Sequence, residues 1–129
     1  MRFDGNRAAG WILAVAFVVT AGFKVERFAV GTTRWTMPVL FMASIIAVEV
    51  CLAVALCSRA RGGAAVWTLI FIAGANVYRI SAGLASRATY DCGCLGSTHI
   101  GPVHHALLSC AFVALSCVII LDNGAPASR

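Results

Sequence analysis

Cys92 and Cys94 are the residues of this sequence best suited to chemistry, and only Gly93 separates them, within "TYDCGCLGST". Two cysteines so close together form a disulfide only if the intervening backbone bends sharply, which glycine permits at the least steric cost. The closed ring would be small and strained, and strain raises the reduction potential of a disulfide. The spacing therefore favours an exchangeable redox pair over a permanent crosslink, with Cys92 and Cys94 as the candidate catalytic residues.

Metal binding is a second interpretation of the same stretch. Three histidines follow the two cysteines, at His99, His104 and His105. Thiolate and imidazole together suit soft or borderline ions such as zinc, copper or mercury. A third interpretation is a turn that merely tolerates small cysteine side chains. The C-x-C spacing alone does not decide among the three.

A carboxylate lies inside one of the apolar runs. Glu49 stands in "SIIAVEVCLAVAL", close to the middle of a predicted helix. An unpaired charge at that depth of a bilayer is costly, so we expect Glu49 to face the interior of a helix bundle and to pair with Lys24 or Arg79. Whether such a pair would serve chemistry or only hold helices together stays open.

The elements that must position these groups are four long apolar runs. The chain has 129 residues, of which 60% are hydrophobic and 12% charged, and its mean hydropathy is +0.89. A bilayer core of about 30 Å needs about 20 apolar residues per helix. The sequence therefore predicts an all-α fold, a four-helix transmembrane bundle that forms a single domain over residues 1–129, with helices at about 8–30, 37–57, 64–84 and 103–121.

The first apolar run, Ala8 to Phe23, has a competing interpretation. A basic start, an apolar stretch and "VTA" near Ala21 would also suit a cleaved signal peptide. Apolar character resumes at Phe28, however, so an uncleaved helix that reaches about Val30 fits the residues equally well, and it is the interpretation that a resemblance of the chain to a known family, given below, implies.

Charge at the ends of the runs predicts the topology. Four spans place both termini on one side, and that side is expected to be cytoplasmic because Lys24 and Arg79, if they lie inside helices, do not count toward the opposite side. We therefore expect a multi-pass protein of the bacterial inner membrane whose "DCGC" segment faces an oxidising compartment. The net charge of +5 does not indicate nucleic acid as a partner, because the arginines are scattered singly and form no basic stripe.

Four more cysteines lie within the predicted helices. Free cysteine behaves as a small apolar residue, so we expect these to pack between helices. In an alternative interpretation Cys110 resolves a mixed disulfide, provided that the preceding loop dips inward. The four are Cys51, Cys57, Cys110 and Cys117.

Three stretches together resemble the MauE branch of the DoxX-like membrane proteins. They are "AGFKVERF" at the end of the first run, "IIAVEVCLAVAL" in the second, and "CGCLG" before the fourth. The layout is similar from about Trp11 to Leu121. Cys92, Gly93, Cys94 and Gly96 match a C-x-C-F-G signature in which Leu95 replaces the aromatic residue, and Lys24 and Glu49 stand where this family carries a lysine and a glutamate.

The resemblance implies a redox-associated membrane protein. Relatives in methylamine-utilisation systems are associated with maturation of a disulfide-rich periplasmic dehydrogenase, although methylamine itself is not carried over to this chain. What is expected is thiol–disulfide exchange, or disulfide maturation, with a periplasmic thioredoxin-like or cysteine-rich partner, and a quinone as candidate electron acceptor. The alternatives are a small heavy-metal carrier and a non-catalytic subunit of a respiratory membrane complex.

Overall fold

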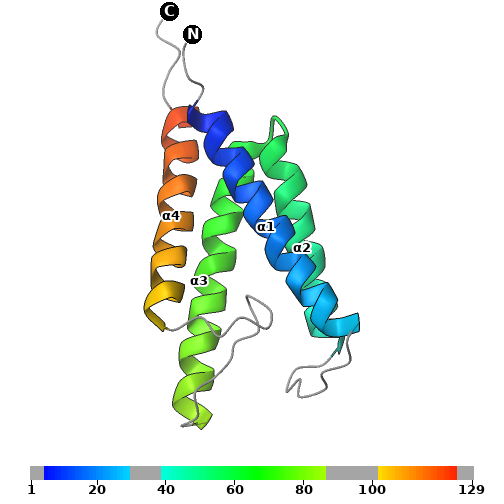
Figure 1. Ribbon diagram of the computed structural model, residues 1–129. Helices are drawn as coiled ribbons and strands as arrows, with labels where there is room; N and C mark the ends of the chain where they lie inside the picture. The colour runs from blue at the N-terminus through cyan, green and yellow to red at the C-terminus, as the bar shows by residue number, and fades with distance from the viewer. Residues whose placement is uncertain (1–4, 30–38, 87–101, 125–129) are drawn as a thin grey trace, which may run out of the picture.

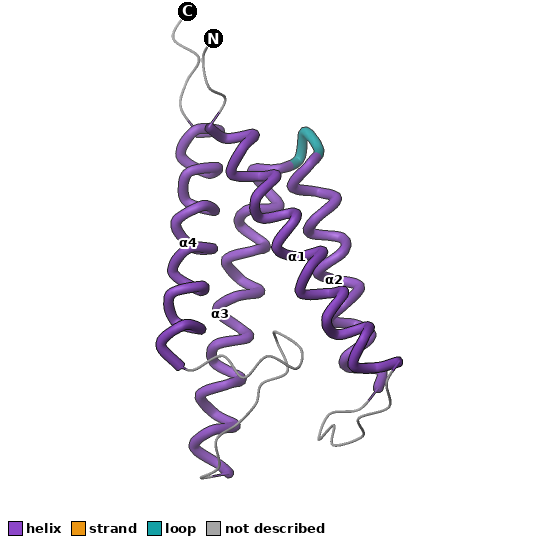
Figure 2. Tube along the Cα trace, viewed as in Figure 1, coloured by secondary structure: helices purple, strands orange, loops and turns teal. Residues whose placement is uncertain are grey.

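The computed structural model describes residues 5–29, 39–86 and 102–124, and these form four helices without any strand (Figures 1 and 2). The predicted all-α, four-helix fold is confirmed. The helix ends lie within a few residues of the predicted ones, because the prediction followed apolar side chains whereas helical hydrogen bonding continues into polar flanks. The helices are α1 (Gly5–Ala29), α2 (Val39–Cys57), α3 (Arg61–Ser86) and α4 (Pro102–Gly124).

Consecutive helices run antiparallel, so the beginning of α1 and the end of α4 lie at the same end of the bundle (Figure 1). The short turn from α2 to α3, at Ser58 to Ala60, lies there too, and we call this the terminal end. A Cβ atom built on Gly62 of α3 would lie 3.3 Å from Nδ2 of Asn123 in α4, which shows how closely these two helices approach. The opposite end, where α3 finishes and α4 begins, is called the cavity end.

The tightest packing is found toward the terminal end. Small side chains let helices approach closely in a membrane, where no hydrophobic effect between helices drives association. Gly10 of α1 shows this most clearly, because a Cβ atom there would lie 3.0 Å from the backbone oxygen of Leu56 in α2. The core cluster consists of Ala9, Leu13, Ala14, Phe17, Leu52, Ala53, Leu56, Ala64, Ala65 and Ile119.

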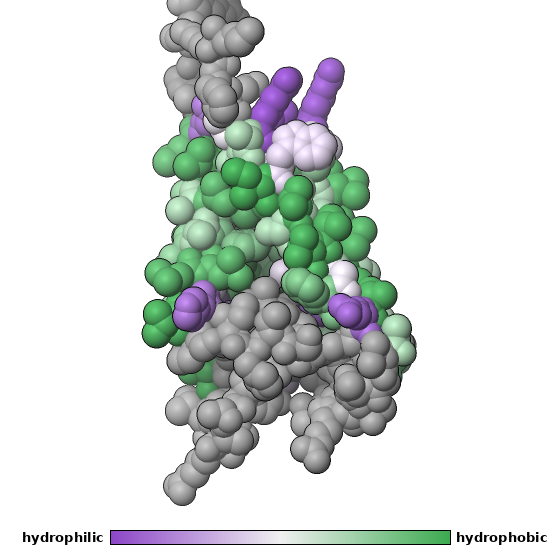
Figure 3. All heavy atoms as spheres, viewed as in Figure 1, coloured by the Kyte–Doolittle hydropathy of each residue, from purple (hydrophilic) through white to green (hydrophobic). Residues whose placement is uncertain are grey.

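The outer surface of the bundle is apolar. Figure 3 shows hydrophobic side chains covering most of the face between the two ends, with hydrophilic ones at the terminal end and at two places lower on this face. Large apolar residues are widely exposed, among them Leu40 and Leu121, which water would not favour but lipid does. Among the described residues three segments are long and apolar enough to cross a membrane, namely Gly5–Glu26, Val39–Cys57 and Val103–Asn123. The chain is a multi-pass membrane protein.

α3 differs from the other three helices in being more amphipathic. Its apolar sequence is interrupted by Asn76 and Arg79. Thr68 of α3 is fully buried and donates its hydroxyl hydrogen to the carbonyl oxygen of Ala64 one turn earlier. The buried hydroxyl of Thr68 is therefore satisfied within its own helix.

Candidate functional site: a cavity inside the bundle

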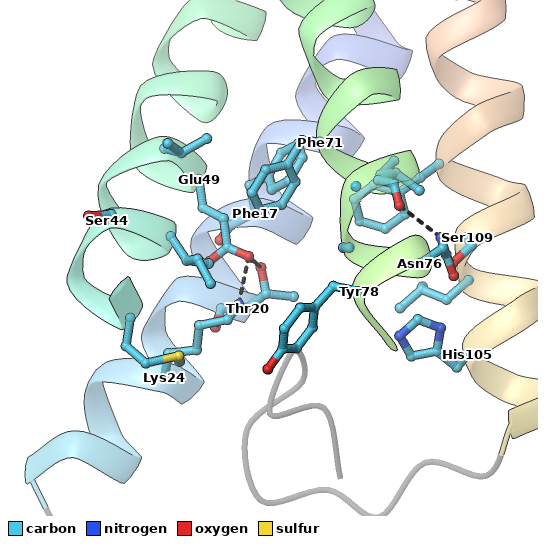
Figure 4. A pocket seen from close by; sticks show the side chains of 18 of the residues that line it. Phe17, Thr20, Lys24, Ser44, Glu49, Phe71, Asn76, Tyr78, His105 and Ser109 are labelled. Carbon is cyan, nitrogen blue, oxygen red and sulfur yellow. Dashed lines mark hydrogen bonds and ion pairs between the residues drawn. The ribbon is translucent and has the colours of Figure 1, made fainter. Parts of the chain in front are cut away.

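A cavity of about 440 Å³ lies between the four helices, nearer to the cavity end than to the terminal end. α1 packs with α2, and α3 with α4, and the two pairs diverge toward that end (Figure 1). Every helix contributes side chains to the wall (Figure 4). The divergence of the two helix pairs creates the site. Small residues at the terminal end let the two helices within each pair approach closely.

The buried ion pair between Lys24 and Glu49 forms one wall of the cavity (Figure 4). Nζ of Lys24 donates to Oε1 of Glu49 at 2.6 Å, and the two side chains are 2% and 5% exposed. The pairing expected of Glu49 is therefore confirmed, with Lys24 as its partner. The side chain of Arg79 lies outside the described part of the structure.

Helical periodicity explains why these two charges are buried. Lys24 follows Phe17 and Ala21 at spacings of seven and three residues, which places all three on the core-facing stripe of α1. Glu49 stands in the same way seven residues after Met42 on the buried stripe of α2. The apolar neighbours on each stripe direct the charged side chains inward, where the two neutralise each other.

Thr20 lies beside the ion pair, one turn before Lys24. Its hydroxyl oxygen is 3.0 Å from the carbonyl oxygen of Phe17 and 3.4 Å from Oε1 of Glu49. A hydroxyl has one hydrogen to donate, so the shorter bond to the backbone competes with the longer bond to the carboxylate. Lys24 is thus the main donor to Oε1.

The second carboxylate oxygen of Glu49, Oε2, is buried and accepts no hydrogen bond within the described part of the chain. An ionised carboxylate has acceptor capacity on both oxygens, and a buried acceptor without a donor is unfavourable. Glu49 is one of the residues that line the cavity, but this oxygen is itself enclosed by protein.

Aromatic rings form another part of the wall. The ring of Phe17 stands edge to face with Phe71 at 6.1 Å and with Phe112 at 5.5 Å between centroids. Phe41 and Tyr78 form a second, tilted pair at 6.3 Å. These rings come from all four helices, and they leave the cavity mainly apolar.

The other polar groups of the wall are bonded mainly to their own helices. Ser44 donates to the carbonyl oxygen of Leu40 at 2.8 Å, and Asn76 donates to that of Ile72 at 2.9 Å. Asn76 also donates to Oγ of Ser109 at 3.4 Å, which links α3 to α4 in the cavity wall. These bonds fix the polar side chains of the wall to their own helices and to each other.

Two of the histidines predicted as possible metal ligands differ in burial and in their position relative to the cavity. His105 is half-buried and lines the cavity, whereas His104 is exposed, because neighbouring residues of a helix point about 100° apart. Within the described residues no three metal-ligating side chains come together. Cys92, Cys94 and His99 lie outside the described residues.

The expectation that the helix cysteines pack between helices is wrong. All four are exposed on the surface of the bundle, and none is in a disulfide. A thiol is apolar enough to face lipid, so burial in the bundle is not required of it. Cys110 is one of these exposed residues, which gives its side chain no place in the cavity.

Several wall residues were not expected from the sequence. Thr20 shares a helix face with Phe17 and Lys24, and this periodic pattern around a buried charge could have indicated it. No comparable signal points to Asn76 and Ser109, whose contact depends on how α3 and α4 pack.

Fold and site together define a four-helix, multi-pass membrane protein that encloses a ligand-sized cavity with a buried ion pair. Comparison of the chain with protein-family models, with curated proteins and with solved structures gives no match.

Proposed function

We propose that this protein is an integral membrane thiol–disulfide oxidoreductase of the bacterial inner membrane, in which Cys92 and Cys94 exchange a disulfide with an exported thioredoxin-like or cysteine-rich partner. The spacing of the two cysteines and the resemblance to MauE-type proteins support this proposal. The observation that carries it is the position of the cavity, at the end of the bundle where Ser86 ends α3 and Pro102 begins α4.

Chain length bounds how far the cysteines can be from that end. Cys92 follows Ser86 by six residues and Cys94 precedes Pro102 by eight. Even a fully extended chain advances only about 3.5 Å per residue, so the two Cα atoms lie at most about 21 Å and about 28 Å from these helix ends. The segment that carries Cys92 and Cys94 thus connects two helix ends at the cavity end, and this connectivity supports a role of the pair beside the cavity.

The exchange proceeds through a mixed disulfide. A thiolate of the reduced partner attacks one sulfur of the Cys92–Cys94 bond and releases the other as a thiolate. The partner's second thiolate then attacks the mixed disulfide, so the partner gains a disulfide while Cys92 and Cys94 become thiols. Restoring their bond removes two electrons and two protons, which a quinone can accept as it becomes a hydroquinone.

Trapping the mixed disulfide tests this proposal. In a chain whose four helix cysteines are serine, Cys94→Ser should leave Cys92 able to hold an exported partner, visible as a band on a non-reducing gel and lost on reduction. The double variant C92S/C94S should give no such band. If C94S traps no partner, and the reduced protein instead binds zinc or mercury stoichiometrically in dependence on His99, His104 or His105, the metal carrier is the better explanation.

A protein that traps no partner and binds no metal would instead be a non-catalytic subunit. It should then co-purify in fixed ratio with other respiratory membrane proteins in a mild detergent. That outcome would also overturn the proposed oxidoreductase.

A further inference from the structure

We propose that the cavity binds a neutral aliphatic lipid whose head group both donates and accepts a hydrogen bond, a long-chain alcohol in the simplest case, and that Asn76 and Ser109 hold this head group. The inference rests on the cavity alone and does not depend on the cysteine chemistry. It concerns the part of the wall that α3 and α4 form, away from the ion pair of Lys24 and Glu49 (Figure 4).

Asn76 presents an acceptor that the protein leaves without a donor. Its Nδ2 donates to the carbonyl oxygen of Ile72 at 2.9 Å and to Oγ of Ser109 at 3.4 Å, while Oδ1 accepts no hydrogen bond within the described part of the chain. The side chain is half-buried and lines the cavity, and Oδ1 is not one of the polar atoms that the protein encloses. In this it differs from Oε2 of Glu49, which is enclosed. A molecule in the cavity can therefore reach Oδ1 of Asn76.

Ser109 presents a donor beside that acceptor. Its Oγ receives Nδ2 of Asn76, whereas its own hydroxyl hydrogen meets no acceptor among the described residues. A hydroxyl group carries one hydrogen and two lone pairs. The O–H group of a ligand can therefore donate to Oδ1 of Asn76 and accept from Oγ of Ser109 at once. A quinone has acceptors only, so it would leave Oδ1 without a donor.

The neutral charge of the ligand follows from the ion pair. Lys24 and Glu49 already compensate each other, and a further charge at this depth would have no partner. Carboxylic acids and amines are charged at neutral pH, whereas an alcohol is not. A neutral head group leaves the ion pair intact.

The rest of the wall suits a flexible hydrocarbon chain. A volume of about 440 Å³ lies within the range of small-molecule sites, about 300–1,000 Å³. Phe17 stands edge to face with Phe71 and Phe112, at interplanar angles of 68° and 82°, so these rings offer no parallel faces between which a flat ring would stack. Phe41 of α2 and Tyr78 of α3 line the cavity and are 46% and 37% exposed, so the wall continues to the lipid-facing surface of these two helices. A chain dissolved in lipid can enter there.

Two pairs of variants separate the head-group contacts from the cavity itself. N76L/S109A removes both polar side chains together, and Ser81→Ala is its control, because Ser81 lies on α3, bonds to its own helix and is not part of the wall. Gly74→Leu fills the cavity, because Gly74 lines the wall and a Cβ atom built there meets nothing within 4 Å. Gly63→Leu is the matched control, since it meets equally open space on α3 but lies outside the wall.

The experiment uses the full chain in lipid nanodiscs. The protein is irradiated with a long-chain alcohol that carries a diazirine in its chain, and the labelled residues are mapped by mass spectrometry. Labelling should be saturable and should lie on wall residues. Dodecanol should displace the probe at about fivefold lower concentration than dodecyl methyl ether, which lacks the donor. Equal displacement by these two compounds, or displacement by decylubiquinone at the same concentration as by dodecanol, would overturn the proposal.

The variants complete the test. N76L/S109A should still be labelled but should lose the preference for dodecanol over the ether, and Ser109→Ala alone should weaken it, whereas Ser81→Ala should leave it unchanged. Gly74→Leu should reduce labelling by about fivefold or more, and Gly63→Leu should not reduce it. A preference that survives in N76L/S109A or, if that variant does not accumulate, in Ser109→Ala would show that these residues do not hold the alcohol. Labelling that is unaffected by Gly74→Leu would show that the alcohol binds elsewhere.

Discussion

Nζ of Lys24 and Oε1 of Glu49 lie 2.6 Å apart and join α1 to α2 in the interior of the bundle. The pair lies at the depth of the cavity and forms part of the cavity wall. Its two charges neutralise each other, so the two helices can both cross an apolar environment. The same contact thus serves the fold and shapes the chemistry of the site.

Removing one member of this pair should destabilise the protein strongly. Glu49→Ala leaves the ammonium of Lys24 buried without a counter-charge, and breaking a buried ion pair in this way typically costs about 3–5 kcal/mol. The midpoint of thermal unfolding in detergent and the amount of protein in the membrane should both fall.

The matched control is the double variant K24M/E49L, in which the charges are lost together. It should be clearly more stable than Glu49→Ala, because no buried charge remains. If Glu49→Ala is as stable as the natural sequence, the pair contributes little to the bundle. If K24M/E49L is no more stable than Glu49→Ala, the packing of the aliphatic parts of the Lys24 and Glu49 side chains matters more for stability than their charges.

The approach of α1 and α2 at Gly10 should tolerate no side chain. A Cβ atom at Gly10 would lie 3.0 Å from the backbone oxygen of Leu56, and a backbone atom cannot move aside without shifting its helix. Gly10→Ala should therefore destabilise the bundle by about 1–3 kcal/mol, the usual cost of overpacking. Gly22→Ala on the same helix meets open space and should be neutral or slightly stabilising. Equal unfolding midpoints for the two variants would contradict the observed helix contact.

The sequence predicted the four helices and the burial of Glu49, because long apolar runs and a charge within one of them have few physical explanations. It did not decide between Lys24 and Arg79 as the partner, since depth along a helix says nothing about which helices are neighbours. The cavity could not be predicted either. It depends on the divergence of two helix pairs, which is a property of how the helices pack in space and not of the sequence of any one helix.

Phe17 should be the most sensitive apolar residue of the cavity wall. Its ring is 3% exposed and contacts the rings of Phe71 and Phe112 on two other helices. Phe17→Ala removes both contacts and should cost about 3–5 kcal/mol, whereas Phe17→Leu keeps most of the volume and should cost less. Unfolding midpoints of the purified variants measure the difference. A Phe17→Ala protein as stable as Phe17→Leu would show that the ring contacts add nothing to simple volume.

Arginines at the terminal end predict which way the protein faces. Arg7, Arg59 and Arg61 lie in the described helix ends and turn of that side, and basic residues near membrane spans favour the cytoplasm. The cavity end, and with it the segment that carries Cys92 and Cys94, is then expected to face outward.

The exposed helix cysteines face the apolar surface, so replacing all four by serine should leave folding intact and remove background labelling. In that variant a membrane-impermeant maleimide, applied to intact cells after mild reduction, should label Cys92 or Cys94, and C92S/C94S should not be labelled. Labelling that requires opening of the cytoplasm would reverse the orientation and place the cysteine pair in a reducing compartment, where the proposed disulfide exchange could not run in the oxidising direction.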